Sequence, residues 1–153
     1  MHSNKKNIKE KIVFEEVLPT DEQIEILYSM LKDREHSISL KKNISYNEHK
    51  KFVNSMPYRA WYIVKYLDGY LGSFYLSNSN TVGINITTGD KMDVITSIIA
   101  YINFKYKPLP EIPSERASNF TINISPYDEE LIQIIESLGG DKVQLTYFMP
   151  ELM

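Results

Sequence analysis

The chain has 153 residues, of which 42% are hydrophobic and 24% charged, and its formal net charge is −3. This composition is that of one globular domain with an ordinary core, and the weak negative charge speaks against a broad nucleic-acid-binding surface. Because the chain contains no cysteine, it has no disulfide, no thiolate metal site and no thiol nucleophile.

The beginning of the chain is polar and basic and does not resemble a secretory signal. No apolar run approaches the ~20 residues that span a bilayer. We therefore expect a cytoplasmic protein with no membrane partner. The first ten residues are expected to be disordered because they are polar and terminal.

One strand and one helix are predicted next. The apolar residues of segment 11–18 predict a strand, which ends at a proline. Thr20 is followed three residues later by Gln23, which is the pattern of a capping box. Apolar residues then recur at helical spacing, so we expect a helix of about three turns over residues 21–34.

A second helix is predicted from Ser45, which has Glu48 in the capping-box position, to the residue before a proline. The segment 36–43 between the two helices has no clear period and is expected to be an exposed loop. His36 in this loop and His49 in the helix are the internal histidines. A lone histidine usually lies on a surface or a helix face, and their spacing suggests no metal site.

Three runs of β-branched and aromatic residues lie between Trp61 and Ile86. The dipeptide Asp68-Gly69 separates the first two runs and is a strong signal for a tight hairpin turn. A Ser/Asn cluster separates the second run from the third, so we expect a three-stranded antiparallel meander. The first two runs are apolar at nearly every position, which predicts a sheet covered on both faces. Gly83, inside the third run, suggests a bulge or a close approach to the backbone.

The rest of the chain alternates helices and strands. Residues 94–106 are predicted to be a buried helix; their β-branched side chains would also suit a strand, but length and composition favour the helix. The proline-rich segment 107–116 is a loop. A strand over residues 119–125, a helix over residues 128–138 that Gly139 and Gly140 close, and a last strand over residues 143–149 follow. This order predicts a mixed sheet with a crossover helix between parallel neighbours.

Several short motifs follow one another along the chain. They are His49-x-x-Phe52-Val53-x-Ser55-x-Pro57-Tyr58-x-x-Trp61-Tyr62, Gly72-Ser73-x-Tyr75-Leu76, Gly83-Ile84-x-Ile86, Asn123-Ile124-x-Pro126, Leu138-Gly139 and Gln144-x-Thr146-Tyr147. In their order and spacing they resemble the GCN5-related N-acetyltransferase (GNAT) family. The resemblance covers nearly the whole chain. It implies a single α/β (α+β) domain, with four helices and a mixed central sheet of about seven strands.

The resemblance also implies a reaction, in which acetyl-CoA donates its acetyl group directly to a small amine; similarity to a bacterial branch suggests an amino sugar. The pantetheine arm would lie along the third strand and the pyrophosphate at the next helix N-terminus, where the dipole favours an anion. The implied cofactor-binding residues are Ile84, Asn85, Ile86, Thr88, Gly89, Asp90, Lys91, Met92 and Asn123. The implied acceptor-binding residues are His36, Tyr58, Trp61 and Tyr75. No catalytic residue and no metal is assigned.

Three features depart from the family pattern. The cofactor loop has one glycine and carries Asp90 and Asp93, whose charges would repel a pyrophosphate. Ile135 occupies the place of a tyrosine that protonates the leaving thiolate, and Gly140 that of a phenylalanine that packs under the cofactor.

Two readings therefore stay open. The chain is either an acetyltransferase with a relaxed cofactor loop or a degenerate, non-catalytic module for binding or assembly that has lost CoA. The second reading predicts a groove that Met92, Ile95 and Ile135 fill. A homodimer formed through the C-terminal strand is a further expectation that comes from the resemblance alone.

Overall fold

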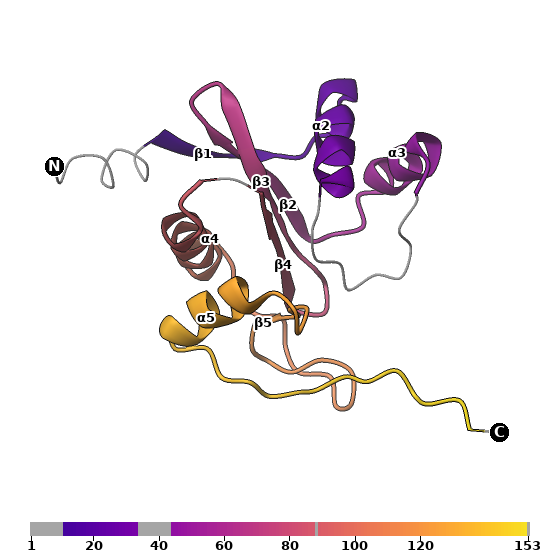
Figure 1. Ribbon diagram of the computed structural model, residues 1–153, viewed down its shortest axis with the longest axis vertical. Coiled ribbons are helices and arrows are strands. Elements are labelled where there is room, and N and C mark those ends of the chain that lie inside the picture. The colour runs from indigo at the N-terminus through magenta and orange to yellow at the C-terminus, as the bar shows by residue number, and fades with distance from the viewer. Residues whose placement is uncertain (1–10, 34–43, 88, 153) are drawn as a thin grey trace, which may run out of the picture.

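The computed structural model describes residues 11–33, 44–87 and 89–152, so the expected disorder of the first ten residues lies outside its description. The described residues form one five-stranded sheet and four helices (Figure 1). The strands are β1 (Ile12–Glu16), β2 (Ala60–Tyr66), β3 (Gly69–Leu76), β4 (Thr81–Ile86) and β5 (Thr121–Ile122). The helices are α2 (Asp21–Lys32), α3 (Tyr46–Asn54), α4 (Lys91–Lys105) and α5 (Glu129–Ser137).

The sheet has the order β1-β2-β3-β4-β5. Its first four strands are antiparallel, whereas β4 and β5 are parallel and α4 crosses over between them. The predicted meander, the mixed sheet and the crossover helix are therefore confirmed. The expected count of seven strands is wrong for the described residues, which contain five.

Two hydrophobic cores lie on opposite faces of the sheet. Trp61 and Ile63 of β2 pack with α2 and α3 on one face. Tyr62 and Val64 pack with α4 on the other face. The two faces alternate along the strand because successive side chains point to opposite sides. Figure 1 shows the resulting layers, with α2 and α3 on one side of the sheet and α4 on the other. The predicted covering of both faces is confirmed.

The starts of the first two helices follow from the predicted caps. The Thr20 hydroxyl accepts a hydrogen bond from the Gln23 amide at 3.2 Å, and the Ser45 hydroxyl does the same for Glu48. The Gln23 side chain does not bond back to the cap, as a capping box would require. Its oxygen instead accepts from the Leu18 amide at 2.7 Å, which ties α2 to the chain that leaves β1.

The bulge of the sheet lies in β3 and not in β4. Val64 pairs with Gly72 and Lys65 with Tyr70, which leaves Leu71 as the extra residue. The register between β3 and β4 is regular throughout. What approaches the backbone at Gly83 is the ring of Tyr75 from the neighbouring strand. A Cβ atom at Gly83 would lie 2.2 Å from two of the ring carbons.

Two predicted strands differ from the structure. The strand expected over residues 119–125 is limited to Thr121–Ile122, because the chain turns away from β4 after the second pair. The strand expected over residues 143–149 does not form at all. Residues 139–152 run away from the domain without secondary structure (Figure 1), since a strand needs a neighbouring edge and this segment lies against none.

Candidate functional site

The site begins where β4 and β5 separate. Their ladder ends at the pair Val82–Ile122, but β4 continues as far as Ile86. The Thr81 carbonyl accepts from Ser77, and the Thr87 amide donates to Leu71. The N–H and C=O groups of the odd-numbered residues of β4 therefore point toward β3. Those of Ile84 and Ile86 point to the other side, into the gap between β4 and β5. Among the described residues, the N–H and C=O groups of these two isoleucines have no hydrogen-bond partner.

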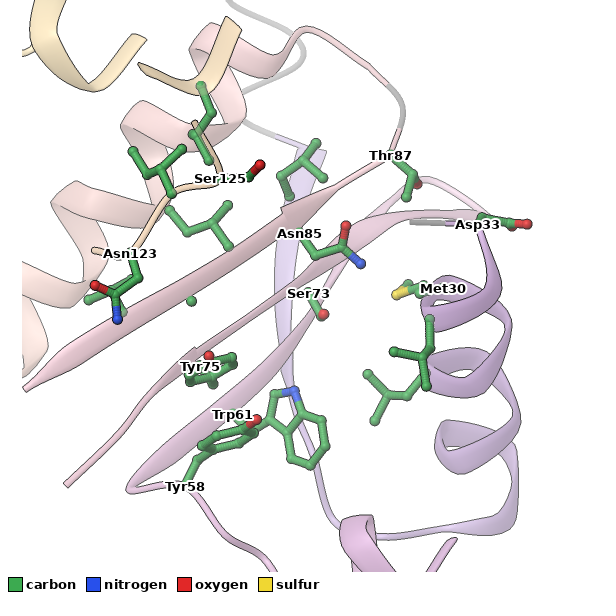
Figure 2. Close-up of a pocket in the computed structure, with 18 of the residues that line it drawn as sticks. Met30, Asp33, Tyr58, Trp61, Ser73, Tyr75, Asn85, Thr87, Asn123 and Ser125 are labelled. Carbon is green, nitrogen blue, oxygen red and sulfur yellow. The ribbon is translucent and has the colours of Figure 1, made fainter. Parts of the chain in front are cut away.

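A groove of about 870 Å³ opens at this gap and continues toward α2 and α3. Figure 2 shows its two sides, with Asn123 and Ser125 on the side beyond β4 and Met30 and Trp61 on the helical side. Of the residues predicted to bind the cofactor, Ile84, Asn85, Ile86, Lys91 and Asn123 line it. Of those predicted to bind the acceptor, Tyr58, Trp61 and Tyr75 line it. His36 and Thr88 lie outside the described residues.

An aromatic wall forms one end of the groove. Tyr75 packs over Gly83, and the ring of Tyr58 stacks on Tyr75 with centroids 3.8 Å apart and planes 7° from parallel. Trp61 meets Tyr58 edge-on at 4.9 Å. Trp61 and Tyr75 are also cross-strand neighbours in register, so strand alternation brings them to the same face.

Two polar side chains lie in the middle of the groove. Ser73 of β3 and Asn85 of β4 face each other in register, one step along the sheet from Tyr75 and Gly83. Figure 2 shows both side chains between the aromatic wall and Met30 of α2. Ser73 was missed by the sequence reasoning, although its spacing of two residues from Tyr75 is a usable signal. The backbone of Asn85 faces β3, so this residue offers the groove its side chain.

His49 lies on a face of α3, one of the two placements expected for it, and is buried there with 6% of its surface exposed. Burial lowers the pKa of its imidazole, and a hydrogen bond to the backbone of Ile24 offsets part of that effect. The ring is therefore neutral at pH 7. His49 contributes to the groove lining, and its Nε2 has no hydrogen-bond partner among the described residues.

The N-terminus of α4 carries its own acidic residues. The Asp90 side chain caps the helix and accepts from the Asp93 amide at 3.4 Å. Lys91 Nζ lies 3.4 Å from a carboxylate oxygen of Glu130 in α5. A second hollow of about 490 Å³ separates this turn from α5. Predicted cofactor residues that line this second hollow are Gly89, Asp90, Lys91 and Met92.

The groove is not filled in the way that a degenerate module would require. Ile135 points toward Gly140, where a Cβ atom would meet its Cγ2 at 2.5 Å, and it does not line the groove. Met92 lines only the second hollow. Ile95 reaches the groove, as does Leu131 of α5.

Two further findings concern residues 11–33, 44–87 and 89–152. No three histidine, aspartate or glutamate side chains gather there in a cluster that could hold a metal ion. No helix in these ranges is long and apolar enough to cross a membrane.

The fold has a counterpart among solved structures. The crystal structure of a possible acetyltransferase from Clostridium difficile 630 superimposes with a TM-score of 0.56, over 93% of this chain and 98% of the other. The two chains share one fold. Their sequences are 14% identical, so the likeness concerns the fold alone. It agrees with the fold that the sequence resemblance implied. No protein-family model and no curated protein matches the sequence.

Proposed function

We propose that this protein is an acetyl-CoA-dependent N-acetyltransferase that acts on a small amine. The observation that carries the proposal is the open edge of β4 at Ile84 and Ile86. Pantetheine is an extended chain with amide groups, so it can pair with a free sheet edge as an added strand does. The acetyltransferase-like fold of the solved neighbour supports the same reading.

The groove suits a direct transfer. The amine nitrogen attacks the thioester carbonyl carbon, a C–N bond forms, and the C–S bond breaks. CoA leaves as a thiolate, which takes up the proton that the amine gives off. A backbone N–H on the open edge of β4, from Ile84 or Ile86, would stabilise the negative charge on the carbonyl oxygen. Asn85 and Ser73 lie close enough to this edge to orient the amine.

The phosphate end fits CoA less well than the pantetheine end. An α-helix N-terminus offers free N–H groups to an anion. At α4, however, the carboxylate of Asp90 already accepts from the Asp93 amide, and Lys91 is paired with Glu130. The two aspartates oppose a pyrophosphate at this turn. We therefore infer that the pantetheine arm contributes more to CoA affinity here than the phosphates do.

The acceptor is proposed to lie against the aromatic wall. The stacked rings of Tyr58 and Tyr75 offer a flat apolar surface, and Ser73 and Asn85 offer hydrogen-bonding groups next to it. An amino sugar, the class that the sequence resemblance suggests, has both an apolar ring face and polar groups. The same surface would also take other small amines with an apolar body.

Calorimetric titration of acetyl-CoA, with CoA and 3′-dephospho-CoA as comparisons, tests the proposal. We expect a micromolar dissociation constant, about −8 kcal/mol, and little loss when the 3′-phosphate is absent. A panel of amino sugars and other small amines, followed by release of free CoA thiol, then reports turnover. No heat at millimolar acetyl-CoA would refute the proposal. That result would favour the non-catalytic alternative, which has lost CoA, whereas binding without turnover over the whole panel would contradict the transfer reaction and leave the cofactor site in place.

A further inference from the structure

The helical side of the groove is mostly apolar. Its apolar lining comes from α2, from α3 and from the residue before the α3 cap: Leu27, Met30, Leu31, Ile44 and Phe52. Asp33 and Glu48 also line this side, but both are exposed, so water screens their charges. The imidazole of His49 belongs to the same lining, with 6% of its surface exposed. A polar group buried to this extent is normally hydrogen-bonded in a folded protein.

One nitrogen of the His49 ring is paired and the other is not. The ring donates a hydrogen bond to the backbone of Ile24 in α2. Nε2 has no partner among the described residues, so Nδ1 makes the bond to Ile24. A neutral imidazole carries its single proton on the donating nitrogen, which leaves Nε2 as an acceptor only. The group that Nε2 can bind is therefore a hydrogen-bond donor.

The neighbouring hydroxyl does not satisfy Nε2. The ring of Tyr28 lies 5.4 Å from the ring of His49, but the Tyr28 hydroxyl donates to the Ile44 carbonyl at 3.2 Å. The ionised carboxylates of Asp33 and Glu48 have no proton to donate. An unpaired buried acceptor destabilises the fold, and a ligand that supplies a donor recovers that loss when it binds. Nε2 is thus a contact that the groove offers to a ligand.

The surroundings of His49 favour a neutral donor over a cation. Burial lowers the pKa of the imidazole because the site disfavours a positive charge. An ammonium beside Nε2 would meet the same penalty, whereas a hydroxyl would not. The lining of the one groove, about 870 Å³ in volume, also includes Ser73 and Asn85, which are proposed to orient the amine. One acceptor molecule can therefore place its amine at this polar pair and a hydroxyl at His49.

We propose that His49 selects acceptors that carry a hydroxyl group away from the reacting amine, and that Nε2 accepts the hydrogen bond of this hydroxyl. The inference rests on the proposed acetyl transfer and adds the class of acceptor, which is an amino alcohol and not a plain alkylamine. His49 determines specificity and takes no proton from the amine. A site built to bond a hydroxyl rejects the analogue without it, because the buried group of the protein is then left unpaired.

Paired acceptors test the inference. Straight-chain amino alcohols of increasing length are compared with the alkylamines of the same length, and kcat/KM with acetyl-CoA is measured for each. We expect the best amino alcohol to exceed its alkylamine by about 10- to 100-fold.

Two variants separate the nitrogens of the ring. His49→Gln carries an acceptor oxygen near the place of Nε2 and should retain the preference for the amino alcohol. His49→Asn keeps a donor for Ile24 but has no group at the place of Nε2, so the preference should disappear. Asn47→Gln, on the exposed side of α3, is the control and should show the preference of the unmodified protein.

Nitrogen NMR of the histidine rings gives a readout that does not depend on turnover. In the unmodified protein with CoA, Nε2 of His49 should give the signal of a bare ring nitrogen. The best amino alcohol should shift this signal toward that of a hydrogen-bonded nitrogen, and the matched alkylamine should leave it in place. If no amine is acetylated, the proposed reaction fails, and this shift still tests the role of His49.

Three results would overturn the inference. Equal kcat/KM values for amino alcohols and alkylamines would leave the acetyl transfer in place but remove the selection. An unchanged preference in His49→Asn means that another group binds the hydroxyl. An Nε2 signal that is already hydrogen-bonded or protonated in the free protein means that a bound water or another group satisfies the ring.

Discussion

The ring of Tyr75 lies on the backbone of Gly83 in the adjacent strand, where a Cβ atom would come within 2.2 Å of it. This contact orients the ring of Tyr75 so that it stacks on the ring of Tyr58. The ring of Tyr58 in turn contacts Trp61. The absence of one side chain in β4 therefore shapes the aromatic wall of the groove. Glycine is needed at this position for space, since it has no positive φ there.

Gly83→Ala should displace Tyr75 and break its stacking on Tyr58. We expect a loss of about 1–3 kcal/mol in the free energy of unfolding, the usual cost of overpacking. The fluorescence of Trp61, the single tryptophan, should change as its neighbour moves. Gly69→Ala is the matched control, because the nearest atom to a Cβ there is 3.7 Å away. Equal stability of the two variants would contradict this account of Gly83.

Asn80 holds the proline-rich loop to the start of β4. It is fully buried, its Nδ2 donates to the carbonyls of Leu109 and Ala117 at 2.9 Å, and its Oδ1 accepts from the Leu109 amide at 2.8 Å. Asn80→Ala would remove three hydrogen bonds made by a fully buried side chain, at a cost of about 3 kcal/mol. Chemical denaturation measures the loss. Asn78→Ala, in the same turn but exposed, should cost little, and a similar loss there would contradict the assignment.

The acidic start of α4 predicts that removing one of its charges strengthens acetyl-CoA binding. Asp90→Asn keeps a good helix cap but removes a negative charge from the turn proposed to meet the pyrophosphate. We expect acetyl-CoA to bind several-fold more tightly to this variant. The gain in affinity should be smaller for 3′-dephospho-CoA only if the charge of Asp90 acts on the 3′-phosphate. Glu111→Gln, in the exposed proline-rich loop, controls for net charge. Unchanged affinity in Asp90→Asn would place the phosphates away from α4.

His49 predicts a pH dependence of stability. Its pKa is lowered in the folded state from an ordinary value of 6.5, mainly by burial. The unfolded chain therefore binds the proton more readily, and stability should fall as the pH drops through and below about 6.5. Thermal unfolding between pH 7.5 and 5.5 measures the slope. His49→Gln should reduce the slope of stability against pH, although His2 and His36 remain. Identical slopes for the variant and the unmodified protein would contradict the role given to His49.

The sequence predicted the parts of the fold that local chemistry decides. Thr20 and Ser45 cap their helices, and the first hairpin forms with a tight turn, because a few neighbouring residues set these features. The two turn residues are Leu67 and Asp68, one position before the predicted Asp68-Gly69, because Gly69 already pairs with Tyr66 and the positive φ falls on Leu67. The last strand was not predictable in the same way. Residues 143–149 have strand chemistry, but a strand forms only where its backbone meets a sheet edge, and in the structure this segment lies against none.

The candidate site was predictable to a similar extent. Strand alternation separated Trp61 from Tyr62, and the structure places them in opposite cores. The same alternation places the Ser73 side chain on the face of β3 that carries Tyr75, so Ser73 was also predictable as a groove residue. The burial of His49 could not be foreseen, because it depends on how α2 packs against α3. The contact between Tyr75 and Gly83 required the register of β3 and β4.

The most direct test of the central claim is the amide NMR spectrum of the ¹⁵N-labelled protein during a titration with acetyl-CoA. The account predicts saturable shifts of the Ile84 and Ile86 amides, which face the gap, with a micromolar midpoint. The Gly83 and Asn85 amides, which face β3, should shift less. Unchanged Ile84 and Ile86 signals at millimolar acetyl-CoA, or shifts confined to other parts of the protein, would contradict a cofactor site on the open edge of β4.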